Sequence, residues 1–585
     1  DLHSFPTRRS SDLVGGFMKK RIVFALLLIM FLAACQSSVQ TTATTSETVT
    51  VQETTGEEVF KVQEKILHTR ISRVPNLDPA KKIDMEDRWI LNHLYTGLIT
   101  YNQDGVLQEG IAKLPKISDD GKTVRFTIKT DAVWNNGDPL TAEDFKRGLM
   151  RLFEEDGQWN KIQFIEGVEE YATMVDLKNW TEEDRNKFLQ DTGKENYEKS
   201  LAEAKEKLGF KIEGNQLIFQ LNHPLPNVLE QFSDPAFYPC HESMLNSAFK
   251  LNENYISNGI FEGDSSMENE IILKKCHQDA DSLLHKISFQ IIQDDAQALA
   301  SYESENLDVL IQPLSYAINE HLNQQSPDLQ IEQDLGVAFL RINMDKDLLK
   351  NKTLRRALAF SIPHESLWKN FCYDAQAPAT ALIPYGFKTK EGVDFREQGN
   401  FLWDSEEDSV ESLNIFNKAL EEEQQTAKNI QLNLLIESNH QMSEIAKYIL
   451  QQWKKILGID VTLLEVDPNK KMQLESIGAF DLSLDFLYAD YTNPLSILET
   501  LRVNHKKNYG HYYNEDFEKT IAPVYFMKQD EAWSTMHEAE QILMSDMPII
   551  PLYFTARSSF VKPHITGIIY TALSYPLFFN TSLGQ

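Results

Sequence analysis

The last third of the chain alternates between strand-like and helix-like segments, and this pattern limits the folds that the chain can adopt. Residues 430–436 and 459–465 are short apolar runs of strand length, and residues 442–457 repeat apolar side chains at helical spacing. Gly458 follows this helical segment as a typical helix-ending glycine. The pattern continues with predicted strands at 481–487 and 549–554 and a predicted helix at 530–544. Such alternation predicts an α/β fold with mostly parallel sheets.

The earlier part of the globular region contains the same two kinds of element. Strands are predicted at 123–129, 217–221, 271–273, 287–292 and 336–342, and a helix is predicted to start at Leu354. Thr141 and Asp144 have the spacing of a capping box, which predicts a helix that begins after Thr141. Residues 181–208 carry many charges at helical spacing, and this predicts a surface helix in contact with solvent.

Composition excludes several classes of protein. Among 585 residues, 42% are apolar and 25% are charged, which is typical of a globular protein and not of a disordered or polytopic membrane protein. The net charge of −30 argues against nucleic acid as a partner. No CxxC pair is present, so a clustered-cysteine zinc site is excluded. We expect Cys240, Cys276 and Cys372 to be buried free thiols.

The sequence carries no recognisable catalytic motif. GxGxxG, GxSxG and HExxH are all missing, and the fourteen histidines do not cluster at metal-ligand spacing. Residues 120–123 imitate the end of a phosphate-binding loop, but Lys116 stands where that loop needs a glycine. We therefore predict no catalytic residue, no metal and no cofactor, and we expect that the chain is not an enzyme.

The N-terminal region has the features of an export signal. Residues 1–17 precede Met18 and are interpreted as a non-native leader. Residues 18–34 contain three basic residues and then thirteen apolar ones, which are too few for a membrane span of ~20 residues. The run ends in LAAC at Cys35, which resembles a lipobox; an ordinary signal peptide is the alternative. This predicts lipidation of Cys35 and a Ser/Thr-rich tether over 35–58.

Eight segments of the globular part have a distinctive order and spacing. They are PNLDP at 75–79, LYTGL at 94–98, SDDGKT at 118–123, WNNGDPLTAEDF at 134–145, SNGIF at 257–261, LRRALAFSI at 354–362, ADYTNP at 489–494 and DMPIIPLY at 546–553. Together they resemble the oligopeptide-binding proteins of bacterial ABC importers, the family-5 extracellular solute-binding proteins. The resemblance covers roughly residue 59 to the C-terminus.

The resemblance implies a two-lobed periplasmic-binding-protein-like α/β fold with a hinge and an extra inserted subdomain. Lobe one would comprise 59–335 plus 555–585, with the inserted subdomain at about 100–233, and lobe two would comprise 336–554. It also implies a monomer that captures oligopeptides as the lobes close and delivers them to the permease and ATPase of an ABC importer. The lipid anchor would hold it on the outer face of the cytoplasmic membrane, or in the periplasm where an outer membrane is present.

Within this family, the resemblance implies particular ligand-binding residues. Asp490, in the ADYTNP segment, matches the carboxylate that pairs with the peptide ammonium, a charge that cannot be enclosed without a partner. An Asx turn or a helix cap is the alternative role for Asp490. Two segments match the strands that pair with the peptide backbone: Phe486, Leu487 and Tyr488 on one lobe, and Lys82, Ile83, Asp84, Met85 and Glu86 on the other.

The chain departs from its relatives at several positions. Leu484 stands where some members have an arginine for the peptide carboxylate, and Asp467 stands where a pocket tryptophan is common. Tyr488 and Gly336 replace a disulfide of some relatives. Peptide length and side-chain preference therefore do not transfer to this chain.

Three other functions are compatible with parts of the sequence. The same fold also binds nickel chelates, haem, sugars or signalling peptides in relatives, and Asp490 favours a peptide among these ligands. A secreted hydrolase would need the nucleophile or metal motif that is missing here. An adhesin or chaperone that keeps the fold is the third alternative.

Overall fold

A computed structural model describes residues 64–584 apart from several internal stretches, of which 177–185, 277–282 and 400–404 are the longest. The predicted leader, signal peptide, lipidated Cys35 and tether lie outside the described residues, as does Cys372. The chain divides into Asp1–Val62 and Gln63–Gln585. The described residues all belong to the second unit.

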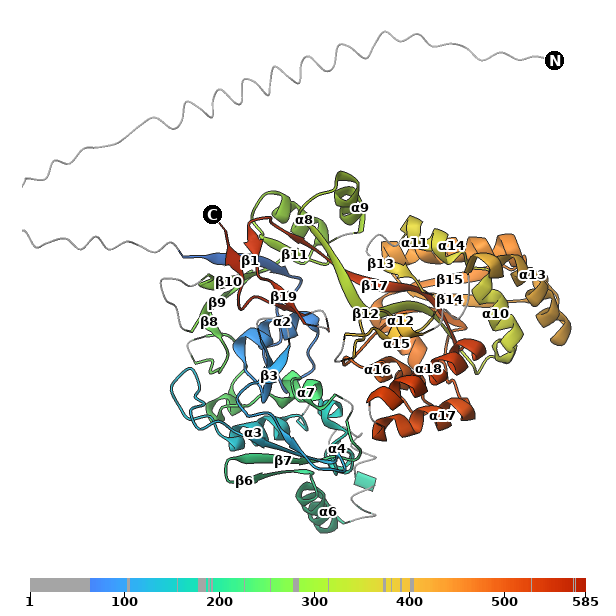
Figure 1. Ribbon diagram of the computed structural model, residues 1–585. Helices are drawn as coiled ribbons and strands as arrows, with labels where there is room; N and C mark the ends of the chain where they lie inside the picture. The colour runs from blue at the N-terminus through green and yellow to red at the C-terminus, as the bar shows by residue number, and fades with distance from the viewer. Residues whose placement is uncertain are drawn as a thin grey trace, which may run out of the picture. The chain divides into compact units, whose positions relative to one another are not determined.

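One mixed sheet of eleven strands runs through this unit (Figure 1). Its order is β15 (Val461–Val466), β14 (Leu432–Glu437), β16 (Leu482–Tyr488), β12 (Leu329–Ile342), β17 (Ile549–Val561), β11 (Val309–Ile311), β1 (Ile66–Ile71), β10 (Lys286–Ile291), β9 (Glu270–Lys275) and β8 (Phe261–Met267), and β13 (Ala375–Pro378) also pairs with β17. The long strands β12 and β17 are neighbours at its centre and connect its two halves.

The prediction of mostly parallel sheets is wrong. Parallel pairing joins β14 to β15 and β16, and β1 to β10 and β11, whereas the other pairs of the large sheet are antiparallel. The order of strands and helices along a sequence identifies the elements but not which strands become neighbours. Here β12 and β17 return to the centre of the sheet between strands of opposite direction, and β8 and β9 form a tight hairpin.

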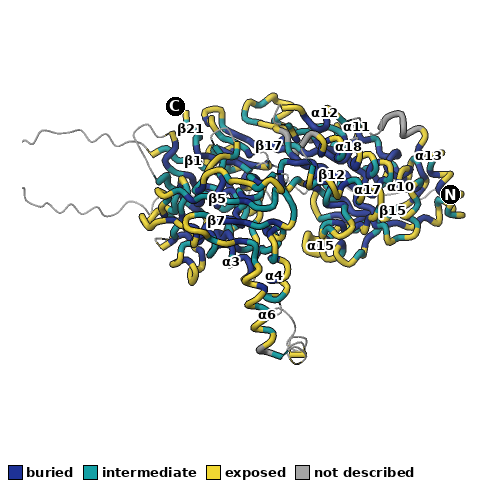
Figure 2. Tube along the Cα trace, turned by 60° about the horizontal axis from the view of Figure 1, so that its bottom comes forward, coloured by how far each residue is buried: buried dark blue, intermediate teal, exposed yellow. Residues whose placement is uncertain are grey.

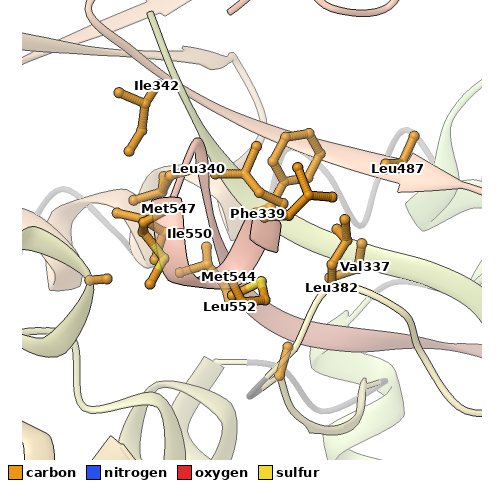
Figure 3. Close-up of a cluster of buried hydrophobic side chains, with 14 of the residues drawn as sticks. Val337, Phe339, Leu340, Ile342, Leu382, Leu487, Met544, Met547, Ile550 and Leu552 are labelled. Carbon is orange, nitrogen blue, oxygen red and sulfur yellow. The ribbon is translucent and has the colours of Figure 1, made fainter. Parts of the chain in front are cut away.

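The described residues contain two large buried clusters of apolar side chains, one of which includes parts of the central strands β12 and β17. The first draws on residues 67–311 and 561–579, and the second draws on residues 335–554. We call the regions around them lobe one and lobe two. Figure 3 shows part of the lobe-two cluster, where Phe339 and Leu340 of β12 lie with Ile550 and Leu552 of β17. The predicted two-lobed α/β fold is confirmed.

Helices pack around the strands of both lobes. Lobe one contains α2 (Met85–Leu94), α3 (Ala142–Arg151), α4 (Val168–Asp176), α6 (Lys194–Glu206), α7 (Val228–Gln231), α8 (Asp295–Glu303) and α9 (Ser315–Gln324). Lobe two contains α10 (Lys352–Phe360), α11 (His364–Phe371), α12 (Phe395–Gln398), α13 (Ser405–Glu422), α14 (His440–Leu457), α15 (Pro468–Ser476), α16 (Leu495–Leu498), α17 (Glu515–Ile521) and α18 (Gln529–Asp546).

Lobe one also carries a separate four-stranded antiparallel sheet. Its order is β4 (Lys116–Ile117), β5 (Thr123–Thr127), β7 (Gln216–Gln220) and β6 (Phe210–Glu213). Small two-stranded pairs complete the fold: β2 (Ile99–Tyr101) with β3 (Leu107–Glu109), β18 (Ile565–Thr566) with β21 (Ser582–Leu583), and β19 (Ile569–Tyr570) with β20 (Pro576–Leu577).

Several local predictions are confirmed. Helix α3 begins after Thr141, whose backbone N–H donates to the Asp144 carboxylate at 2.8 Å. Helix α14 ends at Leu457, and Gly458 adopts the left-handed conformation with φ of 72°. Helix α6 is the described part of the predicted surface helix, and Figure 2 shows it projecting with mostly exposed and half-buried residues.

The two described cysteines of the globular part are both free. Cys240 is buried, as predicted, but Cys276 is only half-buried. Within the described ranges, no helix has the length and apolar character needed to cross a membrane.

The C-terminal segment is fixed to lobe one through a buried histidine. The His93 side chain is fully buried, and its Nε2 accepts a hydrogen bond from the Phe578 backbone N–H at 3.0 Å. Its Nδ1 lies 2.6 Å from the Trp89 carbonyl oxygen, so the single proton of the neutral ring is on Nδ1. The ring also stacks on Phe578, with centroids 5.5 Å apart. A protonated His93 would lose the acceptor for Phe578.

We predict that His93 makes the fold sensitive to acid. Burial lowers the pKa of His93 to about 4 from an ordinary value of 6.5. Between pH 6.5 and about 4, His93 is therefore protonated in the unfolded chain and neutral in the folded chain. The contribution of His93 to the free energy of unfolding is fully present above pH 6.5. It falls by about 3 kcal/mol as the pH drops to 4.

Urea unfolding at pH 4 to 7 checks this prediction. The His93→Gln variant keeps a neutral acceptor at this position and should show a smaller loss of unfolding free energy on acidification than wild type. Other titrating groups change the unfolding free energy of both proteins with pH. The difference between the two pH dependences therefore gives the contribution of His93. Equal slopes would contradict the assignment.

Candidate functional site

A cavity of about 930 Å³ is bordered by residues of both lobes. Its size lies in the upper range of small-ligand sites. The central strands supply Asp334, Tyr553, Thr555, Ala556, Arg557 and Ser558, and β16 supplies Phe486 and Tyr488. Lobe one adds Met85, Asp295, Ile311, Gln312, Pro313 and Asn319, and lobe two adds Asn370, Phe371, Asn439, His440, Gln441 and Glu444.

A second, smaller cavity of about 230 Å³ shares Phe486 and Tyr488 with the first. These two residues occupy alternate positions of β16, and their rings stack with centroids 6.1 Å apart. The remaining lining of the small cavity includes Arg341, Asp485, Asp490, Lys507 and Tyr509. The end of β16 therefore lies between the two cavities, and Asp490 lines the smaller one.

The pairing of β16 determines where its backbone groups point. β16 runs antiparallel to β12, with Leu487 opposite Val337, and the Ala489 N–H donates to the Leu335 carbonyl oxygen at 2.9 Å. Because such contacts recur at every second residue, Leu487 also turns its backbone groups to β12, whereas Phe486 turns them away. The pairing of β14 with β16 covers Leu482 and Ser483 only. Phe486 therefore turns its carbonyl oxygen away from β12 beyond the end of that pairing, while its N–H donates to the Asp485 carboxylate at 2.9 Å.

Asp490 lies in the turn after β16. Its backbone N–H donates to Ser496 Oγ at 2.6 Å, and its carboxylate accepts a hydrogen bond from Lys507 Nζ at 2.8 Å. Just over half of the Asp490 side chain is exposed (56%). Partial burial favours a higher pKa for Asp490, but the charges of Lys507, Lys161 and Lys506 outweigh it and hold the pKa below its ordinary value. Asp490 is therefore an ionised carboxylate that faces a lysine.

The turn contains another residue whose side chain makes an Asx-type turn. Asn493 Oδ1 accepts a hydrogen bond from the Leu495 N–H at 2.9 Å, next to the start of α16. The hydrogen-bond partner of the Asp490 carboxylate is instead the side chain of Lys507. The geometry thus leaves the Asp490 carboxylate directed at an ammonium group rather than at the turn.

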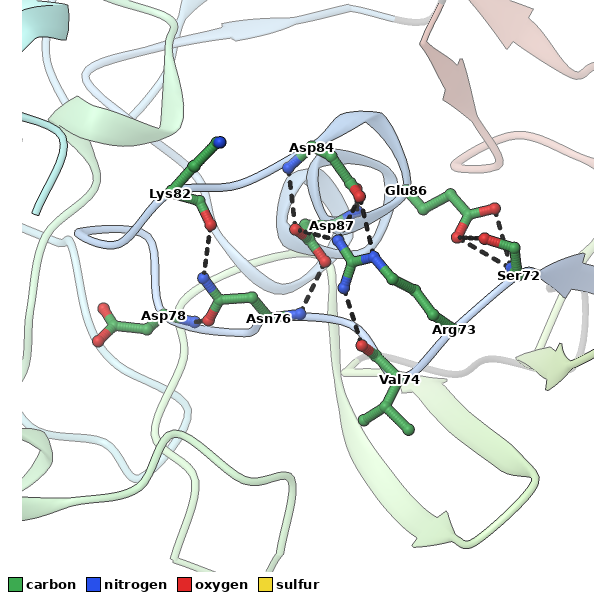
Figure 4. A network of polar contacts seen from close by, with 9 residues as sticks. All are labelled: Ser72, Arg73, Val74, Asn76, Asp78, Lys82, Asp84, Glu86 and Asp87. Atoms are coloured by element: carbon green, nitrogen blue, oxygen red, sulfur yellow. Dashed lines mark hydrogen bonds and ion pairs between the residues drawn. The ribbon is translucent and has the colours of Figure 1, made fainter. Parts of the chain in front are cut away.

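The predicted segment of lobe one, Lys82 to Glu86, uses many of its polar groups internally (Figure 4). Asp84 is the N-cap of α2 and pairs with Arg73. The Lys82 carbonyl oxygen accepts from Asn76 Nδ2 at 3.0 Å, and the Glu86 carboxylate accepts from the N–H and the hydroxyl of Ser72. Ile83 is half-buried against the lobe-one core. Met85 is the member of this segment that lines the large cavity.

The positions that depart from the family pattern have structural roles. Leu484 is buried in the lobe-two core, with a side chain only 1% exposed. Asp467 is the N-cap of α15 and accepts from the Lys470 N–H at 3.0 Å. Gly336 lies directly opposite Tyr488 in the pairing of β12 with β16. The aromatic ring of Tyr488 fills the space above this glycine.

We predict that Gly336→Ala disturbs the site. A Cβ atom at Gly336 would lie 2.4 Å from Thr555 Oγ1 and 2.5 Å from Cδ1 of the Tyr488 ring, and both side chains line the large cavity. Such overpacking typically costs about 1–3 kcal/mol. Chemical unfolding should show this loss of stability, and ligand affinity should fall because Tyr488 must move. Unchanged stability and affinity would contradict the prediction.

Two groups near Asp490 have no signal in the sequence. Lys507 is seventeen positions away and belongs to no motif, so only the fold brings its ammonium to the carboxylate. Glu230 of lobe one accepts hydrogen bonds from the N–H and the hydroxyl of Thr492, at 2.8 and 2.5 Å. Thr492 is inside the ADYTNP segment, but its partner comes from α7 and has no sequence signal. These bonds join the two lobes beside Asp490.

Two further properties bear on chemistry at the site. Burial raises the pKa of Glu230 above its ordinary value, although its bonds to Thr492 and Asn227 oppose this. Across the described ranges, no three His, Cys, Asp or Glu side chains are grouped so that they could hold a metal ion. The arrangement is suited to binding a charged solute through hydrogen bonds.

Comparison with known proteins identifies the family of the chain. Residues 106–509 match the family model described as bacterial extracellular solute-binding proteins, family 5 Middle. The chain is 26% identical over 524 residues to the dipeptide-binding protein DppE of Bacillus subtilis, covering 88% of this chain and 91% of the relative. It is 26% identical over 519 residues to the oligopeptide-binding protein OppA of the same organism, covering 84% and 88%.

Solved structures share the fold. The murein tripeptide binding protein MppA of Escherichia coli superposes with a TM-score of 0.68 at 22% identity, covering 89% of this chain and 99% of that one. OppA of Listeria monocytogenes bound to peptide superposes with a TM-score of 0.66 at 23% identity and the same coverage. Because the family model matches well over half of its length, the chain belongs to the family 5 bacterial extracellular solute-binding proteins.

Proposed function

We propose that this protein captures oligopeptides in the cavity between its lobes and delivers them to the permease of an ABC importer. The observation that carries the proposal is the arrangement at the end of β16, where Phe486 lines both cavities with its carbonyl oxygen turned away from β12 and Asp490 follows as an ionised carboxylate. The relatives DppE and OppA, named for binding dipeptides and oligopeptides, support the same ligand class.

This arrangement fits the chemistry that all peptides share. A receptor for many sequences reads the backbone by adding the peptide as a strand to an exposed sheet edge. The backbone of Phe486, with Leu487 and Tyr488 around it, would supply that edge, and Asp490 would pair with the peptide ammonium. Side chains of the peptide would occupy the 930 Å³ cavity, where both apolar and polar residues line the wall.

Closure of the lobes would enclose the peptide. We assign residues 59–335 and 555–585 to lobe one, with the inserted subdomain at about 100–233, and residues 336–554 to lobe two. The hydrogen bonds of Glu230 to Thr492 would favour the closed arrangement, because they join the lobes next to the proposed ammonium site. Met85 and the segment Lys82–Glu86 would approach the peptide from lobe one. A ligand that contacts both lobes shifts the population toward closure.

Calorimetric titration with short synthetic peptides tests the proposed function. Tetra-alanine and its N-acetylated form have the same backbone and differ in the ammonium. We expect the free peptide to bind and the acetylated peptide to bind at least tenfold more weakly, because Asp490 then lacks its charged partner. Failure of short peptides of several sequences to bind would overturn the proposal.

We further propose that Cys35 carries the lipid that holds the receptor at the membrane. The support is the sequence of residues 18–35, in which a basic start, an apolar run and LAAC follow one another. Labelling of cells with a clickable fatty acid should mark the wild-type protein and not the Cys35→Ser variant. Equal labelling of both would contradict this assignment.

A further inference from the structure

We infer that the Asp490 end of the site selects peptides that carry a carboxylate side chain in one of their first two residues. The inference rests on the proposed function, since it concerns which peptides that site prefers. It follows from the charges around Asp490, which are more numerous than an ammonium site requires. Peptide ammonium would bind Asp490, and the acidic side chain would bind the lysines that surround it.

Lys507 is the first of these lysines, and its backbone is held in place. The Lys507 carbonyl oxygen accepts from Arg341 Nη1 at 2.9 Å, and Arg341 Nη2 donates to the Asp485 carboxylate at 2.8 Å. The Lys507 side chain is one-third exposed and reaches Asp490 at 2.8 Å. An incoming peptide ammonium would share the Asp490 carboxylate with Lys507, which would then lie beside the N-terminal residues of the ligand.

Two further lysines contribute positive charge at the same place. Both Lys506 and Lys161 lower the pKa of Asp490 by their charge, as Lys507 does. Lys506 makes no hydrogen bond or ion pair with the residues that the structure describes. Lys161, in the short 3-10 helix Trp159–Ile162, lies 3.8 Å from Asp234, whose carboxylate is also bonded by Arg88 at 2.9 Å. Three lysines therefore act electrostatically on the Asp490 carboxylate.

The neighbouring carboxylates are occupied by other partners. Glu499 accepts hydrogen bonds from the hydroxyls of Tyr491 and Tyr525, at 3.0 and 2.6 Å. Glu230 accepts from Thr492, as described above. Burial raises the pKa of both Glu499 and Glu230, which favours their neutral forms. Neither carboxylate is placed to neutralise the lysines around Asp490.

Binding of an ammonium alone would thus add a further cation beside Asp490, whose carboxylate already lies near Lys507 and Lys506, while Lys161 is paired with Asp234. A ligand carboxylate within reach of Lys507 and Lys506 restores the balance and forms charge-assisted hydrogen bonds. The carboxylate could come from a side chain near the peptide N-terminus or from the C-terminus of a very short peptide. Amidation of the C-terminus separates these two sources, because it leaves only the side chain.

Calorimetric titration with four amidated tetrapeptides tests the inference on the full protein. Glu-Ala-Ala-Ala and Ala-Glu-Ala-Ala are compared with the same sequences in which glutamine replaces glutamate. At low salt, wild type should bind one glutamate peptide about tenfold more tightly than its glutamine match, the effect of one partly exposed charge-assisted bond. The preference should shrink as salt is raised.

Variants assign the preference to the lysines. In the double variant Lys506→Met and Lys507→Met, we expect the glutamate peptides to bind more weakly and the glutamine peptides to bind as well as or better than before, because Asp490 no longer has an internal partner. Lys454→Met is the matched control, since Lys454 pairs with Asp460 at 2.6 Å on the exposed surface and lines neither cavity. This control should keep the wild-type preference.

The possible results separate the two claims. Equal binding of glutamate and glutamine peptides by wild type, or a preference that survives in the double variant, would overturn the inference and leave the proposed function intact. Binding of no peptide at all, together with no binding of tetra-alanine, would overturn the proposed function. The same four peptides with free C-termini complete the comparison: a preference that appears only with free C-termini would also overturn the inference, because the carboxylate would then be terminal.

Discussion

Replacing Asp490 by alanine is expected to weaken peptide binding about a hundredfold, or roughly 3 kcal/mol. Removal of one member of an enclosed charge pair typically costs 2–5 kcal/mol, and the half-exposed side chain of Asp490 places the effect toward the lower part of that range. The loss has two physical sources. The peptide ammonium loses its carboxylate, and Lys507, Lys506 and Lys161 then repel it without compensation.

A matched control separates this effect from the loss of any surface ion pair. Asp460 also accepts a lysine, with Lys454 Nζ at 2.6 Å, but its side chain is 78% exposed and lines neither cavity. Asp460→Ala should leave peptide affinity unchanged within about twofold, because exposed pairs contribute at most ~1 kcal/mol to stability. Wild-type peptide affinity in the Asp490→Ala variant would contradict the role of Asp490 as the ammonium partner, whatever the control shows.

Replacing Glu540 by alanine is expected to lower the free energy of unfolding by about 3–5 kcal/mol. Arg396 and Glu540 form a two-bond ion pair, with distances of 2.7 and 2.8 Å, and each side chain is only 1% exposed. Glu540 Oε1 also accepts the backbone N–H groups of Leu382 and Ile383. The variant would leave a buried guanidinium and two backbone donors without their acceptor.

Denaturant unfolding of Glu540→Ala measures this loss. The control is Glu203→Ala on α6, where Glu203 faces Lys199 at 3.9 Å and both side chains are more than half exposed. That variant should change stability by no more than ~0.5 kcal/mol. Similar small effects in both variants would contradict the structural role assigned to the buried pair. Peptide affinity at temperatures where both variants remain folded should stay near wild type.

The sequence predicts individual elements better than their assembly. The strand at Thr123–Thr127, the cap at Thr141 and the helix end at Gly458 each depend on neighbours within a few residues, and the structure has all three. The antiparallel pairing of β12 and β17 depends on contacts between segments more than 200 residues apart. No local pattern carries that information, so the predicted parallel sheets are wrong.

The same limit applies to the site. Asp490 lies in a motif and could be singled out, and Phe486 and Tyr488 precede it in a segment that resembles the peptide-pairing strand of the family. Lys507, Lys161 and Glu230 come from three separate elements that only folding brings to Asp490. The lobe-one segment shows a further limit: its polar groups could serve a ligand, but Arg73, Asn76 and Ser72 engage many of them within the turn.

The measurement that tests the central claim most directly is native mass spectrometry of the purified protein before and after denaturing release of bound material. The account predicts a set of released peptides of similar length and mixed sequence from wild type, and a much smaller amount from Asp490→Ala. Release of a metal chelate, haem or sugar in place of peptides would contradict it. So would wild-type protein that carries no ligand and shows no mass shift when short peptides are added.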